Sequence, residues 1–396
     1  MREGPLASVN SEGEARVSTL ELFFDLVFVF TITQLTAVLA DELTWAHVAQ
    51  VLLMFGMIWW IYGGYAWLTN AVMPDGRIRS VLLLVGMGGF LVVALGIPGA
   101  FDNEGLAFGI GYLVIVLVHA GLFSKAAEET AARGIRGFAL FNIAAAVLII
   151  VASAVGETAR YALWVGALAL LAGAPLLRPV DPFRIRPAHF VERHGLLVII
   201  VLGESIVAIG IGAAGLPLTA PLLVTALLAL ALASSLWWTY FMRDERRALA
   251  VLVGASPGRR PVLALTAFFY AYVPMLLGVI AIAAGVKTAI AHPSDHLLVE
   301  QAILLALGVA LFLIGDILFR LTLGIPRGLW LAAAALVVLA TTPLGTSVSA
   351  MAQLAALVAL MALALAAEAR TTPSQEDVPT LDDSAISDGC QRASTH

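Results

Sequence analysis

The chain has 396 residues, of which 61% are hydrophobic and only 12% charged, with a net charge of −5 and a mean hydropathy of +0.96. This composition excludes a soluble globular domain and predicts an all-α polytopic membrane protein. The single cysteine, Cys390, excludes a disulfide framework and a cysteine-based metal site.

Twelve hydrophobic segments follow one another along the chain, and each is long enough to cross a bilayer as a helix. They cover residues 19–40, 46–67, 80–98, 106–123, 138–155, 159–176, 189–213, 219–241, 262–286, 298–319, 328–344 and 348–367. Residues 1–16 are polar and form an N-terminal segment. Residues 368–396 are rich in Ser, Asp and Thr and predict a disordered tail. Pro274 predicts a kink in the ninth segment.

The basic residues predict the orientation of these segments, because cytoplasmic loops carry an excess of Lys and Arg. Of the 22 basic residues, all but Arg160 and Lys287 are assigned to the N-terminal segment, the even-numbered connections and the C-terminal tail, with Arg193, near the start of its segment, counted in the connection before it. This bias predicts that both termini are cytoplasmic.

The two halves of the chain repeat each other in weak but ordered matches. Trp59-Trp60-Ile61-Tyr62 recurs as Trp237-Trp238-Thr239-Tyr240, Gly76-Arg77 as Gly258-Arg259, and Gly134-Ile135 as Gly324-Ile325. Because six spans is an even number, both halves run the same way and predict two parallel six-helix repeats. The repeats cover residues 17–177 and 189–367, with a cytoplasmic linker at 178–188. A substrate or ion path usually lies between such halves.

Ionisable residues lie inside two of the apolar segments. Glu21 and Asp25 are four residues apart and share one helix face. A charge at the depth of Asp25 is costly unless it faces protein, water or a partner. Arg193 and Glu204 are eleven residues apart, which places them on one stripe of their helix, roughly 16 Å apart along the axis. His194 lies on the neighbouring stripe.

These residues, together with two from other segments, predict a polar core through the membrane. The core would run from Glu21 and Arg193, through Asp25, His119 and Asp316, to Glu204. Each member has a structural alternative. Asp25 could pair with Arg193 or Arg320, and Asp316 with Arg320 one turn away. His119 could be a hydrogen-bonded core residue, and Glu21, Arg193 and His194 helix-end charges.

The paired tryptophans, Trp59 with Trp60 and Trp237 with Trp238, are either aromatic-belt anchors or cavity-lining residues. No phosphate-binding loop, zinc helix or nucleophile elbow is present in the sequence. The sequence therefore predicts no cofactor and no metal. Positive-inside sorting and contact with anionic lipid explain the basic runs, so nucleic acid is not an expected partner.

The segments around residues 21–29 and 192–205 resemble the two signature stretches of the bacterial low temperature requirement protein A family. The residues that carry the resemblance are Glu21-Leu-Phe-Phe-Asp25 and Glu192-Arg193-His194-Gly195, followed by Gly203-Glu204-Ser205. The resemblance covers residues 15–367 and implies a multi-pass protein of the bacterial inner membrane. The family's name refers to a growth phenotype and implies no particular chemistry.

Three functions are compatible with this pattern. The favoured one is a proton- or cation-coupled transporter or channel, whose buried carboxylates exchange protons or bind the cation. The alternatives are a membrane enzyme that uses buried carboxylates as general acids on a lipidic or isoprenoid-like substrate, and a structural or sensory membrane protein. The partners expected are the lipid bilayer and an unidentified ion, small solute or lipidic substrate. The oligomeric state is left open.

Overall fold

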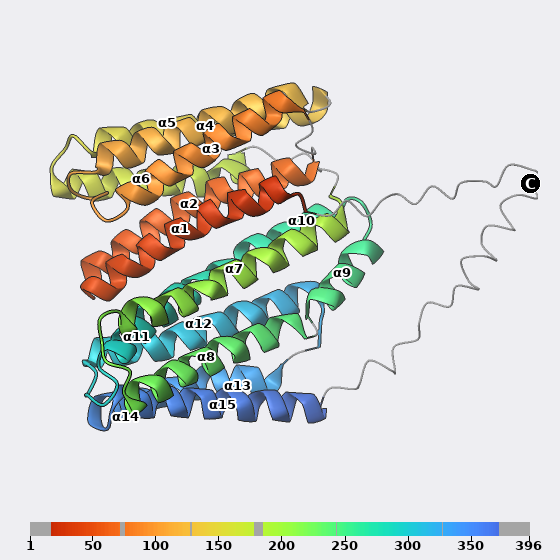
Figure 1. The fold of residues 1–396 in the computed structure, drawn as a ribbon. Helices are drawn as coiled ribbons and strands as arrows, with labels where there is room; N and C mark the ends of the chain where they lie inside the picture. Colours follow the sequence, from red (N-terminus) through yellow and green to blue (C-terminus); the bar gives the residue numbers. More distant parts are fainter. Residues whose placement is uncertain are drawn as a thin grey trace, which may run out of the picture.

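The computed structural model describes residues 17–71, 76–126, 129–177, 185–242, 244–326 and 328–371. This described part is helical and contains no strand. Its helices lie side by side along one direction (Figure 1). Within the described residues, ten helices are long and apolar enough to cross a membrane, so the chain is a multi-pass α-helical membrane protein. The predictions for residues 1–16, the tail from residue 372 and the linker at 178–184 lie outside the described residues.

The first half of the chain forms one side of the bundle. It contains α1 (Thr19–Asp41), α2 (Trp45–Ala71), α3 (Arg77–Gly96), α4 (Gly105–Ala126), α5 (Glu129–Ala152) and α6 (Glu157–Leu177). Helix α3 packs against α1 and α4, and α5 packs against α4 and α6. Figure 1 shows α3–α6 at the outer side of this half, with α1 and α2 facing the rest of the molecule.

The second half begins with α7 and forms the opposite side of the bundle. It contains α7 (Pro187–Ala213), α8 (Ala220–Phe241), α9 (Asp244–Gly254), α10 (Arg260–Ala264), a π-helix (Leu265–Tyr270), α11 (Tyr272–Ala291), α12 (Val299–Leu323), α13 (Leu329–Val337), a 3₁₀ turn (Val338–Thr341), α14 (Thr342–Ser347) and α15 (Ala350–Thr371). Helix α11 packs against α7 and α12, and α13 packs against α12 and α15. The two halves meet where α1 packs against α7 and α11.

Two of the twelve predicted segments are not among the ten candidate spans. Helix α5 has a described apolar part of only Phe138–Ala152, and α6 is absent from the ten. The bounds of α6 nevertheless agree with the predicted segment at 159–176. Two other predicted segments are interrupted. The segment at 262–286 contains the π-helix, and the segment at 328–344 contains the 3₁₀ turn.

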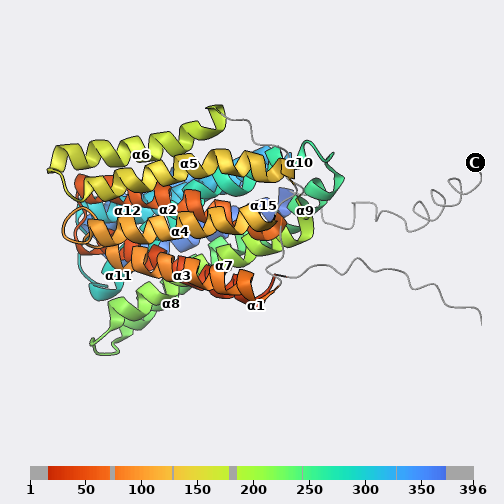
Figure 2. The same ribbon diagram turned by 90° about the horizontal axis from the view of Figure 1, so that it is seen from above.

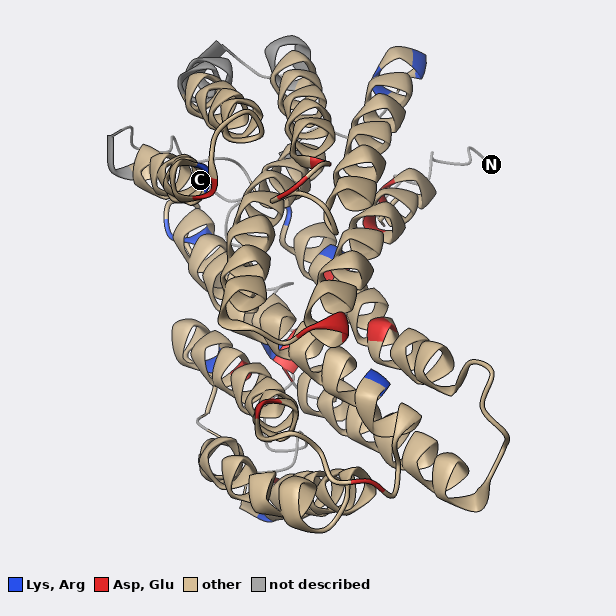
Figure 3. Cartoon of the chain, turned by 90° about the vertical axis from the view of Figure 1, so that its left-hand side faces the viewer, with Lys and Arg blue, Asp and Glu red and all other residues tan. Residues whose placement is uncertain are grey.

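Helix α1 begins and α15 ends at the same end of the bundle (Figures 1 and 2). We call this the terminal end. Charged residues occupy few positions on the helices, and long stretches of the bundle carry none (Figure 3). At the opposite end, Lys287 of α11 forms an exposed ion pair of 2.8 Å with Asp41 of α1.

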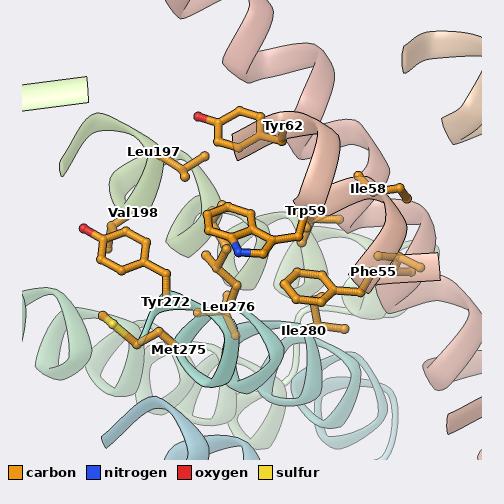
Figure 4. Close-up of a cluster of buried hydrophobic side chains, with 14 of the residues drawn as sticks. Phe55, Ile58, Trp59, Tyr62, Leu197, Val198, Tyr272, Met275, Leu276 and Ile280 are labelled. Atoms are coloured by element: carbon orange, nitrogen blue, oxygen red, sulfur yellow. The ribbon is translucent and has the colours of Figure 1, made fainter. Parts of the chain in front are cut away.

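Apolar and aromatic side chains fill the interface between the halves. Phe55 and Trp59 of α2 face Tyr272 and Leu276 of α11, and Leu197 of α7 closes the cluster (Figure 4). The rings of Trp59 and Tyr272 lie 6.4 Å apart and nearly parallel. Because these residues are buried, the interface is a packed core rather than an open channel at this level.

A hydrogen bond from α2 reaches the backbone of the irregular ninth segment. In a π-helix, a carbonyl accepts from the N–H five residues later, and for Phe269 that residue is Pro274, which has no N–H. The indole N–H of Trp59 donates to the Phe269 carbonyl at 3.1 Å. The first half therefore supplies a donor to the backbone of the π-helix.

Replacing Trp59 by phenylalanine should lower the free energy of unfolding by about 1–3 kcal/mol, because the Phe269 carbonyl loses its donor while the aromatic packing is kept. Thermal unfolding in detergent would show this as a lower melting temperature. Trp237→Phe is the matched control, because Trp237 is 39% exposed and its indole forms no hydrogen bond to a described residue. Equal melting temperatures for the two variants would show that the hydrogen bond from Trp59 to Phe269 does not stabilise the protein.

Candidate functional site

The interface between the halves holds a buried ionic group that joins α1 to α7. The guanidinium of Arg193 donates to Glu21 Oε1 and to Asp25 Oδ1, each at 3.1 Å. Arg193 and Glu21 are 1% exposed and Asp25 is fully buried. A third contact, from His189 Nε2 to Glu21 Oε2, measures 3.3 Å. We call these four residues the ionic seam.

Local helix geometry places the two carboxylates of the seam. Ser18 caps the start of α1, and its hydroxyl accepts the Glu21 N–H while the Glu21 carboxylate accepts the Ser18 N–H. This capping box fixes Glu21 at the first turn of the helix. Asp25 lies one turn later on the same face, as its spacing predicted. Both carboxylates therefore point to the same side of α1, where Arg193 lies.

Helix α2 completes the seam with hydroxyl groups. The Tyr62 hydroxyl donates to Asp25 Oδ1 at 2.9 Å, and the Arg193 guanidinium also donates to the Thr69 hydroxyl. Arg193 lies 5.9 Å from the centre of the Tyr62 ring. Asn70 contacts His189 Nδ1 at 3.2 Å. The seam is thus built from α1 and α2 of the first half and α7 of the second.

The seam contains two carboxylates, one guanidinium and one imidazole. Because a single guanidinium faces both carboxylates, it can balance only one of their two charges. Asp25 Oδ2 is buried and has no hydrogen-bond partner among the described residues. A buried, uncompensated carboxylate oxygen is costly in an apolar environment. The geometry therefore suits a site that also binds a proton or a small cation.

Glu204 lies farther along the same interface. Its side chain is buried, and the Thr33 hydroxyl of α1 donates to Glu204 Oε2 at 2.5 Å. It is eleven residues beyond Arg193 on α7, which is roughly 16 Å along the helix axis. Glu204 and the seam are therefore two separate polar levels of the α1–α7 interface.

His194 faces the second half rather than the seam. Its Nδ1 lies 2.8 Å from the Phe190 carbonyl, and its ring packs edge-on against Phe268 and Tyr272. The Tyr272 hydroxyl lies 2.6 Å from the hydroxyl of Tyr240. His194 is thus part of an aromatic cluster.

Asp316 belongs to a second ionic cluster, which lies within the second half. Arg320 Nε lies 2.9 Å from Asp316 Oδ2 and 2.7 Å from Asp244 Oδ2, and Arg320 Nη1 lies 3.4 Å from Glu368 Oε1. Asp244 and Asp316 are completely buried. We call these four residues the second cluster. Because α9, α12 and α15 supply them, the cluster ties the helices of one half together.

His119 lies in the first half and lines a pocket of about 230 Å³. Trp60 also lines this pocket, and its indole N–H donates to Asn142 Oδ1 at 2.9 Å. Trp237 and Trp238 are 39% and 52% exposed and do not line it. The predicted ionisable residues are therefore distributed over five places: the seam, the Glu204 level, the aromatic cluster around His194, the second cluster and this pocket.

Several residues of the site were not predicted from the sequence. His189 lies one turn before Arg193 on α7, and this spacing could have indicated it. Tyr62 is part of the repeated aromatic motif. Thr69 and Asp244 carried no signal, because Thr69 lies in an ordinary apolar segment and Asp244 in a basic run. Among the described residues, no group of three or more His, Cys, Asp or Glu side chains could hold a metal ion.

Comparison with known proteins identifies the family that the motifs of α1 and α7 resemble. The family model of the bacterial low temperature requirement A protein matches residues 16–367. The chain belongs to this family. An uncharacterized protein of Rhizobium meliloti (strain 1021), RA0937, is 29% identical over 304 residues, which cover 71% of each chain. The family match spans both halves, so the seam, the pocket and three residues of the second cluster lie inside it, and Glu368 lies just beyond its end.

Proposed function

We propose that this low temperature requirement A protein is a proton- or cation-coupled transporter, and that the coupling site is the ionic seam. The observation that carries the proposal is the position and charge of the seam. Arg193 of one half holds Glu21 and Asp25 of the other inside an apolar bundle, so one guanidinium faces two carboxylates. Ionisable residues in this position are usually parts of an ion or proton pathway.

A proton or cation that binds at Asp25 would compete directly with Arg193. The carboxylate would then lose attraction for the guanidinium, and the contact between α1 and α7 would weaken. Binding is in this way linked to movement of one half relative to the other, which alternating access requires. Glu204 and Thr33 form a second contact between the same two helices. An ion that leaves Asp25 would therefore find another carboxylate, Glu204, farther along the interface.

We also propose that the two halves are parallel repeats, residues 17–177 and 189–367, in the bacterial inner membrane with cytoplasmic termini. The order of neighbours supports this. In the first half α3 packs against α1 and α4, and in the second α11 packs against α7 and α12, which are the corresponding helices. The terminal end would face the cytoplasm, because the basic residues fall on that side and Lys287 on the other.

The alternative of a membrane enzyme has less support. The pocket beside His119 is lined by no carboxylate, so neither Asp25 nor Glu204 could act there as a general acid. The carboxylates instead bridge α1 and α7, as a coupled transporter requires.

Replacing Glu204, the carboxylate of the second polar level, by neutral glutamine should abolish ion movement. The purified protein would be reconstituted into liposomes that contain a pH-sensitive dye and a small-molecule extract of bacterial cells, which supplies the unidentified solute. A potassium gradient with valinomycin would drive proton entry, and radioactive sodium uptake would test the cation. We expect Glu204→Gln to reduce the flux to that of protein-free vesicles, because Gln cannot exchange a proton or neutralise a cation.

Asp41→Asn is the matched control. It removes a carboxylate that also bridges the two halves, but one that is exposed at the opposite end of α1. It should leave the flux close to that of the unchanged protein. Undiminished flux in Glu204→Gln, or an absence of protein-dependent flux in the unchanged protein, would overturn the proposal.

A further inference from the structure

The pocket beside His119 lies between the two halves and is separate from the ionic seam. Helices α2, α4, α5 and α6 form one wall, and the residues from Pro261 to Tyr270 form the other. We propose that this pocket binds a neutral amphiphile from the bilayer: an apolar chain or ring that carries a hydrogen-bonding oxygen. This proposal does not depend on transport by the seam.

The lining of the pocket indicates a neutral and mainly apolar ligand. The described residues that line it include no Asp, Glu, Lys or Arg. The walls are mostly aromatic and aliphatic, formed by Trp60, Trp67, Phe138, Leu265 and Phe269 among others. A charged ligand group would have no partner here, and burial of an unpaired charge is strongly unfavourable. Apolar walls with few polar groups are typical of small-molecule sites.

The polar groups of the pocket indicate an oxygen on the ligand. Trp60 donates to the side-chain oxygen of Asn142, which fixes the orientation of the amide. The NH₂ group of Asn142 then has no partner among the described residues and can donate to a ligand oxygen. The ring of His119 lies in the same pocket. A hydroxyl or carbonyl group therefore fits this part of the pocket better than a purely apolar molecule does.

Two adjacent glycines of α2 allow both walls to approach closely. A Cβ atom at Gly64 would lie 2.9 Å from His119 Nε2, and one at Gly63 would lie 2.5 Å from the Phe269 ring. Side chains at these positions would push His119 and Phe269 out of their places. The opposite wall contains the π-helix, and such helices are frequent at functional sites.

The exposure of the lining residues indicates where the ligand enters. Val262 and Tyr270 are 59% and 49% exposed, so the pocket opens to the surface beside them. Both residues belong to the candidate span Arg260–Ala291, so this surface faces the bilayer. The ligand is accordingly expected to arrive from the lipid phase.

Photolabelling with a simple amphiphile tests the proposal. The probe is n-octanol with a diazirine on its chain, applied to the full chain in lipid nanodiscs without an ion gradient. Peptide mass spectrometry would locate the label. We expect saturable labelling of the segments that line the pocket, and loss of that labelling in excess unlabelled n-octanol. Unsaturable labelling spread over the lipid-facing helices would overturn the proposal.

Two variants make the test specific. Gly64→Ala should reduce the pocket labelling to the level seen with excess octanol, because the new methyl group displaces His119. Gly166→Ala is the control, since a Cβ there meets open space. Asn142→Leu keeps the size of the side chain and removes the donor, and should also weaken labelling if Gly64→Ala does not fold. Labelling equal to that of the unchanged protein in a folded Gly64→Ala or Asn142→Leu protein would contradict the proposal.

Discussion

Replacing Arg193 by methionine is expected to lower the free energy of unfolding by about 3–5 kcal/mol, one of the two largest effects expected for this protein. Methionine retains the apolar length of the side chain, but Glu21 and Asp25 lose their only arginine partner among the described residues. Two like charges would then remain buried beside each other, which is strongly unfavourable. We expect the melting temperature of Arg193→Met in detergent to fall well below that of the unchanged protein, and the purified variant to be less monodisperse.

Removal of the two unpaired carboxylates should restore most of the free energy of unfolding that Arg193→Met loses. The triple variant Arg193→Met, Glu21→Gln and Asp25→Asn removes the guanidinium and both carboxylates of the seam, and glutamine at position 21 can still cap α1. Arg370→Met is the control for loss of a positive charge, because Arg370 is exposed at the end of α15. Two results would contradict a stabilising role for these ion pairs. One is a melting temperature of Arg193→Met equal to that of the unchanged protein, and the other is a triple variant whose melting temperature is no higher than that of Arg193→Met.

Much of the fold could be predicted from the sequence because apolar length determines where a membrane helix begins and ends. Helix α1 was expected at 19–40 and spans Thr19–Asp41, and α8 was expected at 219–241 and spans Ala220–Phe241. Pro274 predicted a kink in the ninth segment, whereas the π-helix just before it, at Leu265–Tyr270, was not predicted. Trp59 from the other half donates to a carbonyl of this π-helix, and a local pattern carries no information on such a partner.

The candidate site was only partly predictable for the same reason. Spacing within one helix correctly placed Glu21 and Asp25 on one face, and pairing of Asp25 with Arg193 was one of the alternatives considered. Spacing does not determine which helices become neighbours. Asp316 therefore pairs with Arg320, which also pairs with Asp244, rather than lining one path with Asp25.

The second large effect concerns transport and compares two buried aspartates. Asp25→Asn changes the seam between the halves, whereas Asp316→Asn changes the second cluster, in which Asp244 and Glu368 still face Arg320. Both substitutions keep the shape of the side chain. If the seam couples ion movement to motion of the halves, only the first should abolish flux, because asparagine cannot take up a proton or neutralise a cation.

The most direct test is therefore the proton or sodium flux of these two variants in liposomes, corrected for the amount of folded protein inserted. We predict that Asp25→Asn falls to the rate of protein-free vesicles and that Asp316→Asn keeps most of the flux of the unchanged protein. If Asp25→Asn instead transported normally and only melted at a lower temperature, the seam would be a structural ion pair and the central claim would be wrong.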